Sequence, residues 1–473
     1  MLDELSYKVL TNLETSYERK QPVGSKLIDR YALTIDQSTV TQHSYFEQII
    51  PAINRILMDS EAYRIDPDNV LIRLLPEILS HLSFEQILMY YPNDFILHFL
   101  FEDKIENVSV LCLEVILLNL PEPETLHFLR DNNMIYRLLR EIYFKKETPI
   151  SVLNKIERLI TVVNGVEEIK LLESCIPILK EIRESDNTVL LSRYLDLVSL
   201  LLRYLPDFSP QLYSFTKQEF LKYSDDPLFL ILLIQFYVKL VKLEAPVDLS
   251  LPLSDILSLY DKFDFLVKNE VVELVAQMTF TQSYTDVLFK SQIFKTHNLL
   301  EVFEKTENSD TRLLSKANPQ VIYELNNAIY PDVLAHLNLF TNNLYFPILL
   351  NFMGSTTIFY QLKLHLNNEK LSQLPMDKLF KLLLEMSTHN HSKEHLFNNL
   401  PTIMATNLLE TEDLRNNELW NLKLEILQNL LNDDSVPGFE FWHQELTRNY
   451  ELMAFGRVFR NAAPRVDVID ETA

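Results

Sequence analysis

Three histidines, His389, His391 and His395, form the one histidine cluster of the chain, and histidine is the side chain that most often binds transition metals. His391 and His395 are four residues apart, which places both on one face of a helix. A zinc site usually takes three or four protein ligands, and no cysteine or carboxylate completes this group. We therefore interpret the cluster as a solvated helix start, and we expect neither a metal nor another cofactor.

Two adjacent carboxylates, Asp225 and Asp226, resemble an acid/base pair. Helix capping explains them better, because Asp226 precedes Pro227 and a long apolar run. The sequence also contains no GxGxxG, Walker lysine, HExxH or CxxC motif. We predict that the protein is not an enzyme.

A basic spot consists of Arg137, Arg140, Lys145 and Lys146. Such spots bind phosphate backbones when the whole surface is basic, but this chain has a formal net charge of -23. We interpret the spot as a solvated face. The charge disfavours direct binding to nucleic acid or to anionic membranes and favours a partner with a basic surface.

Composition indicates an all-helical protein. The 473 residues are 47% hydrophobic, and only five are glycine, the residue that phosphate loops and barrel bends require. Cys112 and Cys175 lie in apolar contexts, and the N-terminus MLDELSYK lacks the features of a secretory leader. We expect a cytoplasmic protein, with the nucleus as a second compartment.

The stretch from Phe215 to Leu243 is predicted to be a helical hairpin around which the chain is organised. Thr216 and Glu219 have the spacing of a capping box, and a second helix should start after Asp226. The second helix is apolar except for one narrow polar stripe, so we expect it to be covered on nearly every side and Leu232 to be buried. A membrane span is excluded because polar residues interrupt the run before the roughly 20 apolar residues that a bilayer requires.

Helix starts recur along the chain at intervals of about 40 residues, the period of HEAT and armadillo units. The expected second helices of successive pairs start near Asn107, Thr148, Asn187, Asp226 and Asn269. Later helices are expected at 330–340, 343–353, 374–386 and 416–431. We predict an all-α, HEAT/armadillo-like solenoid, a right-handed superhelix of paired helices.

The predicted organisation has three parts. Residues 1–43 should hold an amphipathic helix over residues 1–20 followed by an irregular or weakly extended segment. Residues 44–460 should form the solenoid, and residues 461–473 a disordered acidic tail.

The polar stripes of the second helices are the predicted binding ladder, because second helices usually line the concave side of such arrays. The candidate partner-binding residues are Glu114, Asn154, Arg158, Ser192, Asp196, Arg203, Gln235, Lys239, Glu273 and Gln277.

Four segments, Ser214 to Glu244, Asn318 to Val321, Leu396 to Met404 and Phe441 to Tyr450, resemble the fungal HEAT-repeat chaperone of 26S proteasome base assembly. That family is also described as a DNA mismatch-repair protein, because of a mutability phenotype. The resemblance covers parts of residues 190–450, and none of the matching segments is a catalytic motif.

The resemblance implies a solenoid that holds the C-terminal domain of one AAA ATPase subunit of the proteasome base. The partner would come in a module of two ATPases and a scaffold subunit, and the chaperone would leave before the particle is complete. Any part in the response to DNA damage or in DNA repair would then be indirect.

Two alternatives remain. One is an adaptor for another basic protein, such as a carrier of localisation peptides, although those armadillo proteins repeat Trp and Asn along their groove and this chain has only Trp420 and Trp442. The other is an enzyme with an unfamiliar helical site, which would require a pocket of convergent ionisable groups.

Overall fold

The computed structural model describes residues 2–35, 46–165, 172–173, 175–202, 209–244, 247–296, 312–325, 339–343, 345–410 and 416–456. These residues form helices and short connections, and no strand occurs among them. The prediction of an all-α helical-repeat solenoid is confirmed.

The chain divides into two compact units. Unit 1 comprises Met1–Phe215 and Leu243–Asp248, and unit 2 comprises Thr216–Lys242 and Leu249–Ala473.

The helices of unit 1 are α1 (Leu2–Arg19), α2 (Ser25–Ala32), α4 (Phe46–Leu57), α5 (Ala62–Ile65), α6 (Val70–Leu79), α7 (Phe84–Tyr90), α8 (Asn93–Phe101), α9 (Glu106–Leu118), α10 (Pro123–Asp131), α11 (Met134–Leu138), η1 (Leu139–Tyr143), α12 (Ile150–Gly165), α14 (Ile176–Arg183), α15 (Thr188–Leu201) and α16 (Pro210–Tyr213).

The helices of unit 2 are α17 (Lys217–Lys222), α18 (Pro227–Lys242), α19 (Ser250–Ser258), η2 (Tyr260–Lys262), α20 (Phe265–Met278), α21 (Gln282–Ser291), α22 (Ile293–Thr296), α23 (Arg312–Lys316), α24 (Pro319–Leu325), α26 (Phe346–Phe352), α27 (Thr356–Leu362), α28 (Asn368–Ser372), α29 (Met376–Thr388), α30 (Asn390–Asn399), α31 (Pro401–Ile403), η3 (Met404–Leu409), α32 (Asn417–Leu431) and α33 (Phe439–Phe455).

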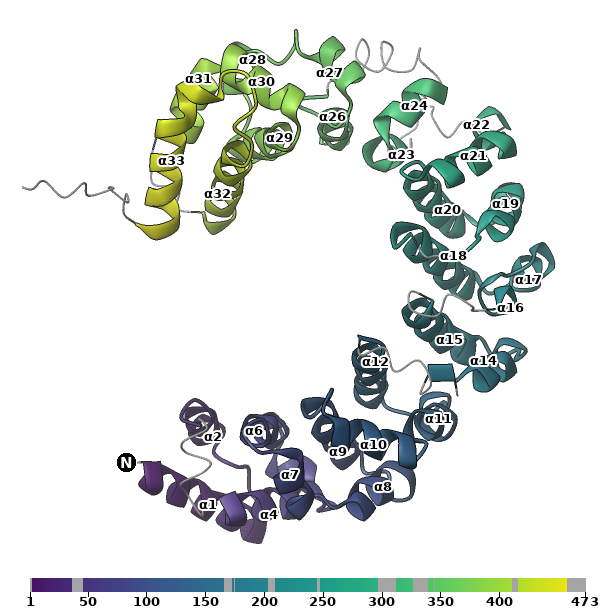
Figure 1. The fold of residues 1–473 in the computed structure, drawn as a ribbon, viewed down its shortest axis with the longest axis vertical. Coiled ribbons are helices and arrows are strands. Elements are labelled where there is room, and N and C mark those ends of the chain that lie inside the picture. The colour runs from purple at the N-terminus through teal and green to yellow at the C-terminus, as the bar shows by residue number, and fades with distance from the viewer. Residues whose placement is uncertain are drawn as a thin grey trace, which may run out of the picture. The chain divides into compact units, whose positions relative to one another are not determined.

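Within each unit, successive second helices pack side by side. In unit 1, α6, α9, α12 and α15 contact one another in that order, and in unit 2 the order is α18, α20, α23, α26, α29 and α32. We call these the second-helix rows. Figure 1 shows α18, α20 and α23 along one side of unit 2, with α17, α19 and α21 along the other. Each helix therefore buries its sides against its neighbours and leaves one face of the row exposed, as in HEAT arrays.

The N-terminal helices belong to unit 1. Helix α1 confirms the amphipathic helix expected over residues 1–20 and packs on α4, while α2 packs on α6. The expectation of an irregular segment at residues 21–43 is wrong over Ser25–Ala32, where α2 buries Ile28 and Tyr31. Residues 36–43 and the predicted acidic tail lie outside the described residues.

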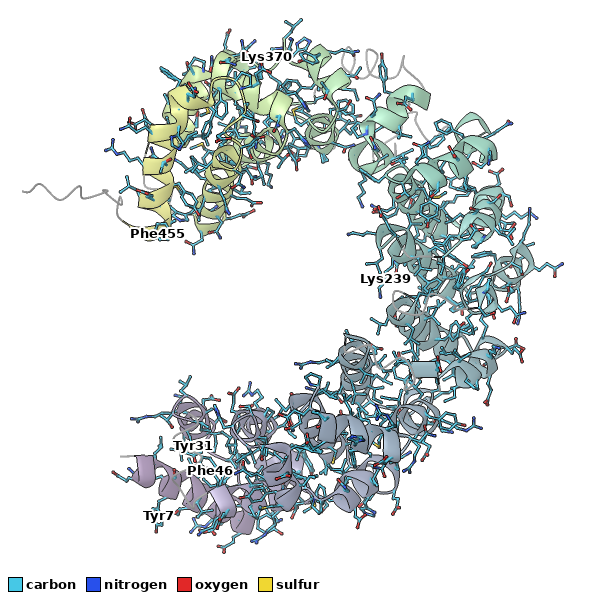
Figure 2. The ribbon with its side chains drawn as sticks, in the orientation of Figure 1. Tyr7, Tyr31, Phe46, Lys239, Lys370 and Phe455 are labelled. Carbon is cyan, nitrogen blue, oxygen red and sulfur yellow. The ribbon has the colours of Figure 1, made fainter. Side chains whose placement is uncertain are left out.

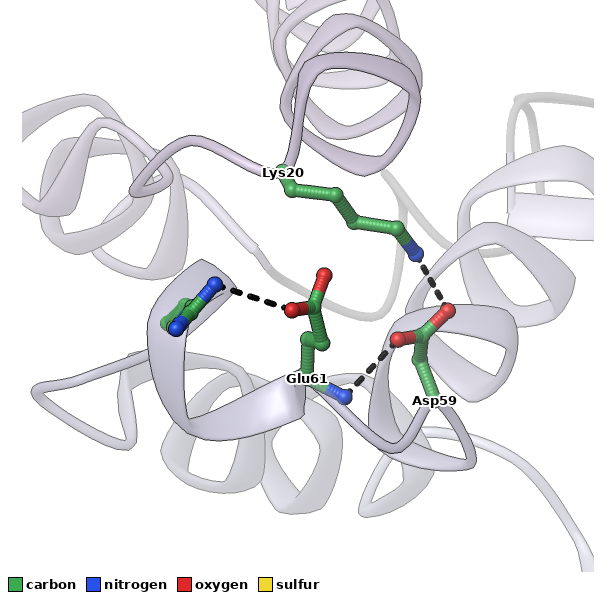
Figure 3. Close-up of polar contacts among 4 residues, drawn as sticks. Lys20, Asp59 and Glu61 are labelled. Carbon is green, nitrogen blue, oxygen red and sulfur yellow. Dashed lines mark hydrogen bonds and ion pairs between the residues drawn. The ribbon is translucent and has the colours of Figure 1, made fainter.

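A chain of polar contacts fixes the end of α1 to the turn between α4 and α5 (Figure 3). Lys20, in the left-handed backbone region at φ 51°, forms an ion pair with Asp59. The other carboxylate oxygen of Asp59 accepts from the Glu61 backbone N–H at 2.9 Å, and the Glu61 side chain pairs with Arg64 at 2.9 Å. These contacts hold the end of α1 against the helices that follow it in unit 1.

The capping signals identify most helix starts correctly. The capping boxes of Ser83 with Gln86 and of Thr216 with Glu219 are both present. Helices α9, α12, α15 and α18 begin within two residues of the predicted positions. Helix α20 begins at Phe265 instead of near Asn269, because the Asp264 carboxylate accepts from the Leu266 N–H at 2.9 Å. Of the later predictions, 343–353, 374–386 and 416–431 correspond to α26, α29 and α32, whereas 326–338 lie outside the described residues.

Helix α18 is less covered than its composition suggests. It buries eight side chains, among them Leu233 and Leu240. Leu232, however, is 43% exposed and Leu228 is 72% exposed. The prediction that Leu232 is buried is therefore wrong. The two leucines lie on the same side of α18 as Gln235. This side belongs to the exposed face of the row, where no neighbouring helix packs.

Candidate protein-binding surface

The exposed face of the unit 1 row carries part of the predicted ladder. Asn154 and Arg158 are exposed one turn apart on α12, and Asp196 is exposed on α15. Ser192 is half-buried, and its hydroxyl donates to the Thr188 carbonyl at 2.8 Å. The face is polar and mixed in charge, and Ser192 contributes to it least because its hydroxyl is occupied.

Glu114 does not belong to this exposed face. It is 9% exposed and forms an ion pair with Lys155, which projects from the neighbouring α12. Helix α9 is covered by α6, α8 and α12, so nearly all of its side chains are buried. Glu114 thus joins α9 to α12 and is not placed to meet a partner directly.

Arg203 lies outside the described residues. The other four predicted residues lie on α18 and α20, on the corresponding face of unit 2. Figure 2 labels Lys239 on that side of the unit and Lys370 on the opposite side. Gln235 and Lys239 are exposed, while Glu273 and Gln277 are half-buried.

Contacts between helices organise the unit 2 face. The Gln235 side-chain amide donates to Glu270 at 3.2 Å, which connects α18 to α20. Glu273 pairs with Lys316 at 2.5 Å, which connects α20 to α23. Sequence reasoning missed Glu270 and Lys316 because these partners become visible only when adjacent helices are aligned.

Sequence reasoning also missed four exposed apolar residues on the same two helices. Leu228 and Leu232 on α18 and Phe265 and Leu266 on α20 are between 43% and 72% exposed. The available signal was position: three of the four lie in the first two residues of a helix, before neighbouring helices close around it.

The histidine cluster is structural in this fold. The Nε2 of His391 donates to the Met353 carbonyl at 2.8 Å, and the Nε2 of His395 donates to the Leu366 carbonyl at 2.8 Å. Burial lowers the pKa of His389 below 6.5, and the neighbouring His391 lowers it further. The ring nitrogens thus connect α30 to the preceding repeat. Among the described residues, no three or more His, Cys, Asp or Glu side chains are grouped to hold a metal ion.

Of the aspartate pair, Asp226 acts in capping, as predicted. Asp226 Oδ1 accepts from the Phe229 N–H at 3.0 Å, and Asp225 is exposed beside it. One carboxylate of the two is therefore used by the backbone of α18.

The arginines of the basic spot are paired with acids. Arg137 bonds Glu141 at 3.0 Å, and its guanidinium lies over the Phe101 ring. Arg140 bonds Glu181 at 3.1 Å. Two of the four basic side chains of the spot are therefore paired with acids of their own chain.

The backbone carbonyl groups of the basic spot accept hydrogen bonds from Arg193, a residue of α15. The Arg193 guanidinium donates to the carbonyls of Tyr143 at 2.8 Å and Lys146 at 3.2 Å, and to that of Lys145. Tyr143 is the last residue of η1, and Lys145 and Lys146 follow it, so no further helical turn supplies N–H groups to these carbonyls. Arg193 thus fixes α15 to the end of the preceding repeat.

A cavity of about 460 Å³ opens between α8, α9, η1 and α12 in unit 1. Leu100, Ile142 and Val152 line it, and Lys104 and Thr148 lie at its edge. Lys104 donates to the Glu141 carbonyl, and the Thr148 hydroxyl donates to the Ile142 carbonyl. The backbone thus already uses both of these polar groups. No helix in the described part of the chain is long and apolar enough to cross a membrane.

Comparison with known proteins places the chain in a family. The N-terminal domain of DNA mismatch repair protein HSM3 matches residues 7–242, and the C-terminal domain of that family matches residues 254–473. The family boundary therefore follows α18, whereas Thr216–Lys242 belongs to unit 2. A protein of that name from Candida albicans is 92% identical over the full length of both chains. One from Scheffersomyces stipitis is 37% identical over 100% of this chain and 98% of its own, and one from Saccharomyces cerevisiae is 21% identical over 86% of each. The chain therefore belongs to the family named DNA mismatch repair protein HSM3.

Proposed function

We propose that the chain is a non-catalytic assembly chaperone of the 26S proteasome regulatory particle base. It binds the C-terminal domain of one AAA ATPase subunit, within a module of two ATPases and a scaffold subunit. The binding surface is formed by the exposed faces of the second-helix rows.

One observation carries the proposal. In unit 2, α18, α20 and α23 present a continuous face whose polar side chains are joined from helix to helix, Gln235 to Glu270 and Glu273 to Lys316. Such a row offers side chains from several adjacent helices at once. A stable protein interface needs about 1,200–2,000 Å² of buried surface in total, which a row of helices supplies and a single loop does not.

The chemistry of the described residues supports binding over catalysis. His391 and His395 bond backbone carbonyl groups, Asp226 caps a helix, and the arginines of the basic spot pair with acids. The partner is expected to bind without nucleotide or metal.

The name of the relatives refers to mismatch repair, and we propose that any such role of this chain is indirect. A formal net charge of -23 repels a DNA backbone, whose binding depends on neutralising phosphates. A chaperone of the proteasome would influence repair through the proteins that the proteasome degrades.

An adaptor for another basic protein is the alternative function. The net charge of the chain favours this adaptor as much as it favours the chaperone.

The test is biolayer interferometry of the full chain against each ATPase C-terminal domain, at low and moderate salt. The variant reverses two acids of the second-helix rows, the exposed Asp196 and the half-buried Glu270, as Asp196→Lys with Glu270→Lys. The matched control reverses Glu184 and Glu369, which are exposed outside those rows and give the same net charge. Glu114 is left unchanged because reversing it would place a lysine beside Lys155 in a buried site.

One domain is expected to bind with a dissociation constant in the micromolar range or below. The row variant should associate more slowly, with a weaker dependence on salt than the control, because exposed acids steer a basic partner more than they hold it. If no domain binds at micromolar concentration, the chaperone proposal fails and the adaptor alternative takes its place. If the row variant matches the control at both salts, the assigned surface is wrong.

A further inference from the structure

Two adjacent second helices of unit 2 begin with exposed apolar side chains. Leu228 is 72% exposed and Leu232 43% on α18, and Phe265 is 68% exposed and Leu266 54% on α20. We call these four residues the α18–α20 patch. Exposed apolar side chains scattered singly are ordinary, but large ones gathered on neighbouring elements mark interaction sites.

The contact between Gln235 and Glu270 brings the two halves of the patch together. Leu232 precedes Gln235 by about one helical turn, and Leu266 precedes Glu270 by about one turn. Because α18 packs along α20 and the two polar side chains touch at 3.2 Å, the leucines lie on the same edge of the pair.

The exposure of the patch is not a deficit of the core. The residues that follow Leu232 and Leu266 in the sequence, Leu233 and Val267, are both 0% exposed. The core of these helices is therefore complete without the patch. A similar first-turn position is apolar in unit 1, where Ile150 on α12 is 74% exposed.

Carboxylates border the patch. Asp226 caps α18 by accepting from the Phe229 N–H at 3.0 Å, and Asp264 caps α20 by accepting from the Leu266 N–H at 2.9 Å. Asp225 is exposed next to Asp226. Capping holds two of these negative charges in place, so the apolar surface has an anionic rim that favours a partner with basic flanks.

We infer that the α18–α20 patch anchors an amphipathic helix whose apolar side chains are flanked by lysine or arginine. Side chains standing on two packed helices form parallel ridges, into which the i, i+3, i+4 face of a third helix fits. An anionic lipid surface would be repelled by the rim. The inference deepens the proposed function, in which this helix belongs to the ATPase C-terminal domain.

The first experiment measures fluorescence anisotropy of a labelled 18-residue amphipathic Leu/Lys helix titrated with the full chain, with a Leu/Glu helix of the same pattern as the second probe. The patch variant is Leu228→Ser with Leu266→Ser. The matched control is Leu251→Ser with Leu364→Ser, two leucines of unit 2 that are 63% and 78% exposed outside the second-helix row. Far-UV circular dichroism checks that both variants stay folded, and Phe265→Ser is the substitute if the double variant does not.

The patch variant should bind the Leu/Lys helix at least about tenfold more weakly than wild type, as for a truncated interface anchor. The control should bind as wild type does, and the Leu/Glu helix should bind at least about tenfold more weakly than the Leu/Lys helix. Equal weakening by the control, or no weakening by the patch variant, would overturn the inference.

The same variants titrated with the ATPase C-terminal domain separate the inference from the proposed function. If the Leu/Lys helix depends on the patch and no ATPase domain binds, the proposed function fails and the inference stands. If an ATPase domain binds wild type and patch variant alike, the inference fails and the proposed function stands.

Discussion

Leu232 and Leu233 are neighbours in α18 and differ sharply in environment, which makes them a matched pair for testing the fold. Leu233 is 0% exposed, whereas Leu232 is 43% exposed. Each is changed to aspartate in a separate variant. Both changes alter the helix propensity and the net charge equally, so a difference in stability reports burial alone.

The magnitudes follow from the exposed fractions. Burying a whole leucine side chain stabilises a protein by about 1.5–3 kcal/mol, so the partly buried Leu232 contributes about 1 kcal/mol. At Leu233 the full contribution is lost, and a carboxylate enters an apolar site at a cost of several kcal/mol. The sum approaches the net stability of about 5–15 kcal/mol that is usual for a folded domain.

The assay is urea unfolding followed by far-UV circular dichroism. Leu232→Asp should unfold cooperatively with a slightly lower midpoint, and Leu233→Asp should lose the folded baseline of unit 2. Equal effects of the two substitutions would refute the assignment of the exposed face of α18. So would a Leu232→Asp protein that does not fold.

Three further changes test contacts between repeats. Glu114→Gln leaves Lys155 without its partner and should lower the free energy of unfolding by up to about 3 kcal/mol. The double variant Glu114→Gln with Lys155→Met should restore most of this loss. An unchanged urea midpoint in Glu114→Gln would contradict the pairing. Arg193→Met should cost about 1–3 kcal/mol because backbone carbonyls lose their donor, whereas Arg158→Met, at an exposed position, should change little in the same assay. The pKa of His389 in the folded protein is below its ordinary 6.5, so folding favours the neutral imidazole. The contribution of His389 to stability is therefore full above pH 6.5 and is lost as the pH falls through the folded pKa. His389→Gln should flatten this part of a plot of thermal midpoint against pH.

Helix caps and periods in the sequence predicted much of the fold, because these signals act over a few residues. The capping box at Thr216 and the start of α32 after Asn416 are examples, since each cap satisfies backbone N–H groups of its own first turn. The segment Ser25–Ala32 was missed because Gly24 and the β-branched run after it suggested irregular backbone. Packing of α2 on α6 outweighs these weak local preferences.

The candidate surface was only partly predictable. Periodicity shows that Gln235 and Lys239 share a stripe, but it does not show which face of a nearly apolar helix stays uncovered. Leu232 was assigned to the core for that reason. Glu114 was assigned to the surface because its pairing with Lys155 depends on the alignment of two helices about 40 residues apart in the sequence. The exposure of a side chain thus depends on how neighbouring helices pack in the row, which the sequence of a single helix does not show.

We propose that this chain accompanies one ATPase of the proteasome base before the particle is complete. The most direct measurement is affinity purification of the tagged full-length chain from cells, followed by gradient separation and quantitative mass spectrometry of each fraction. We expect the chain to sediment with two ATPase subunits and a scaffold subunit in near-equal amounts, and to be depleted from fractions containing the proteasome core particle. Co-sedimentation with mismatch-repair proteins without any ATPase subunit, or equal amounts in the finished proteasome, would contradict it.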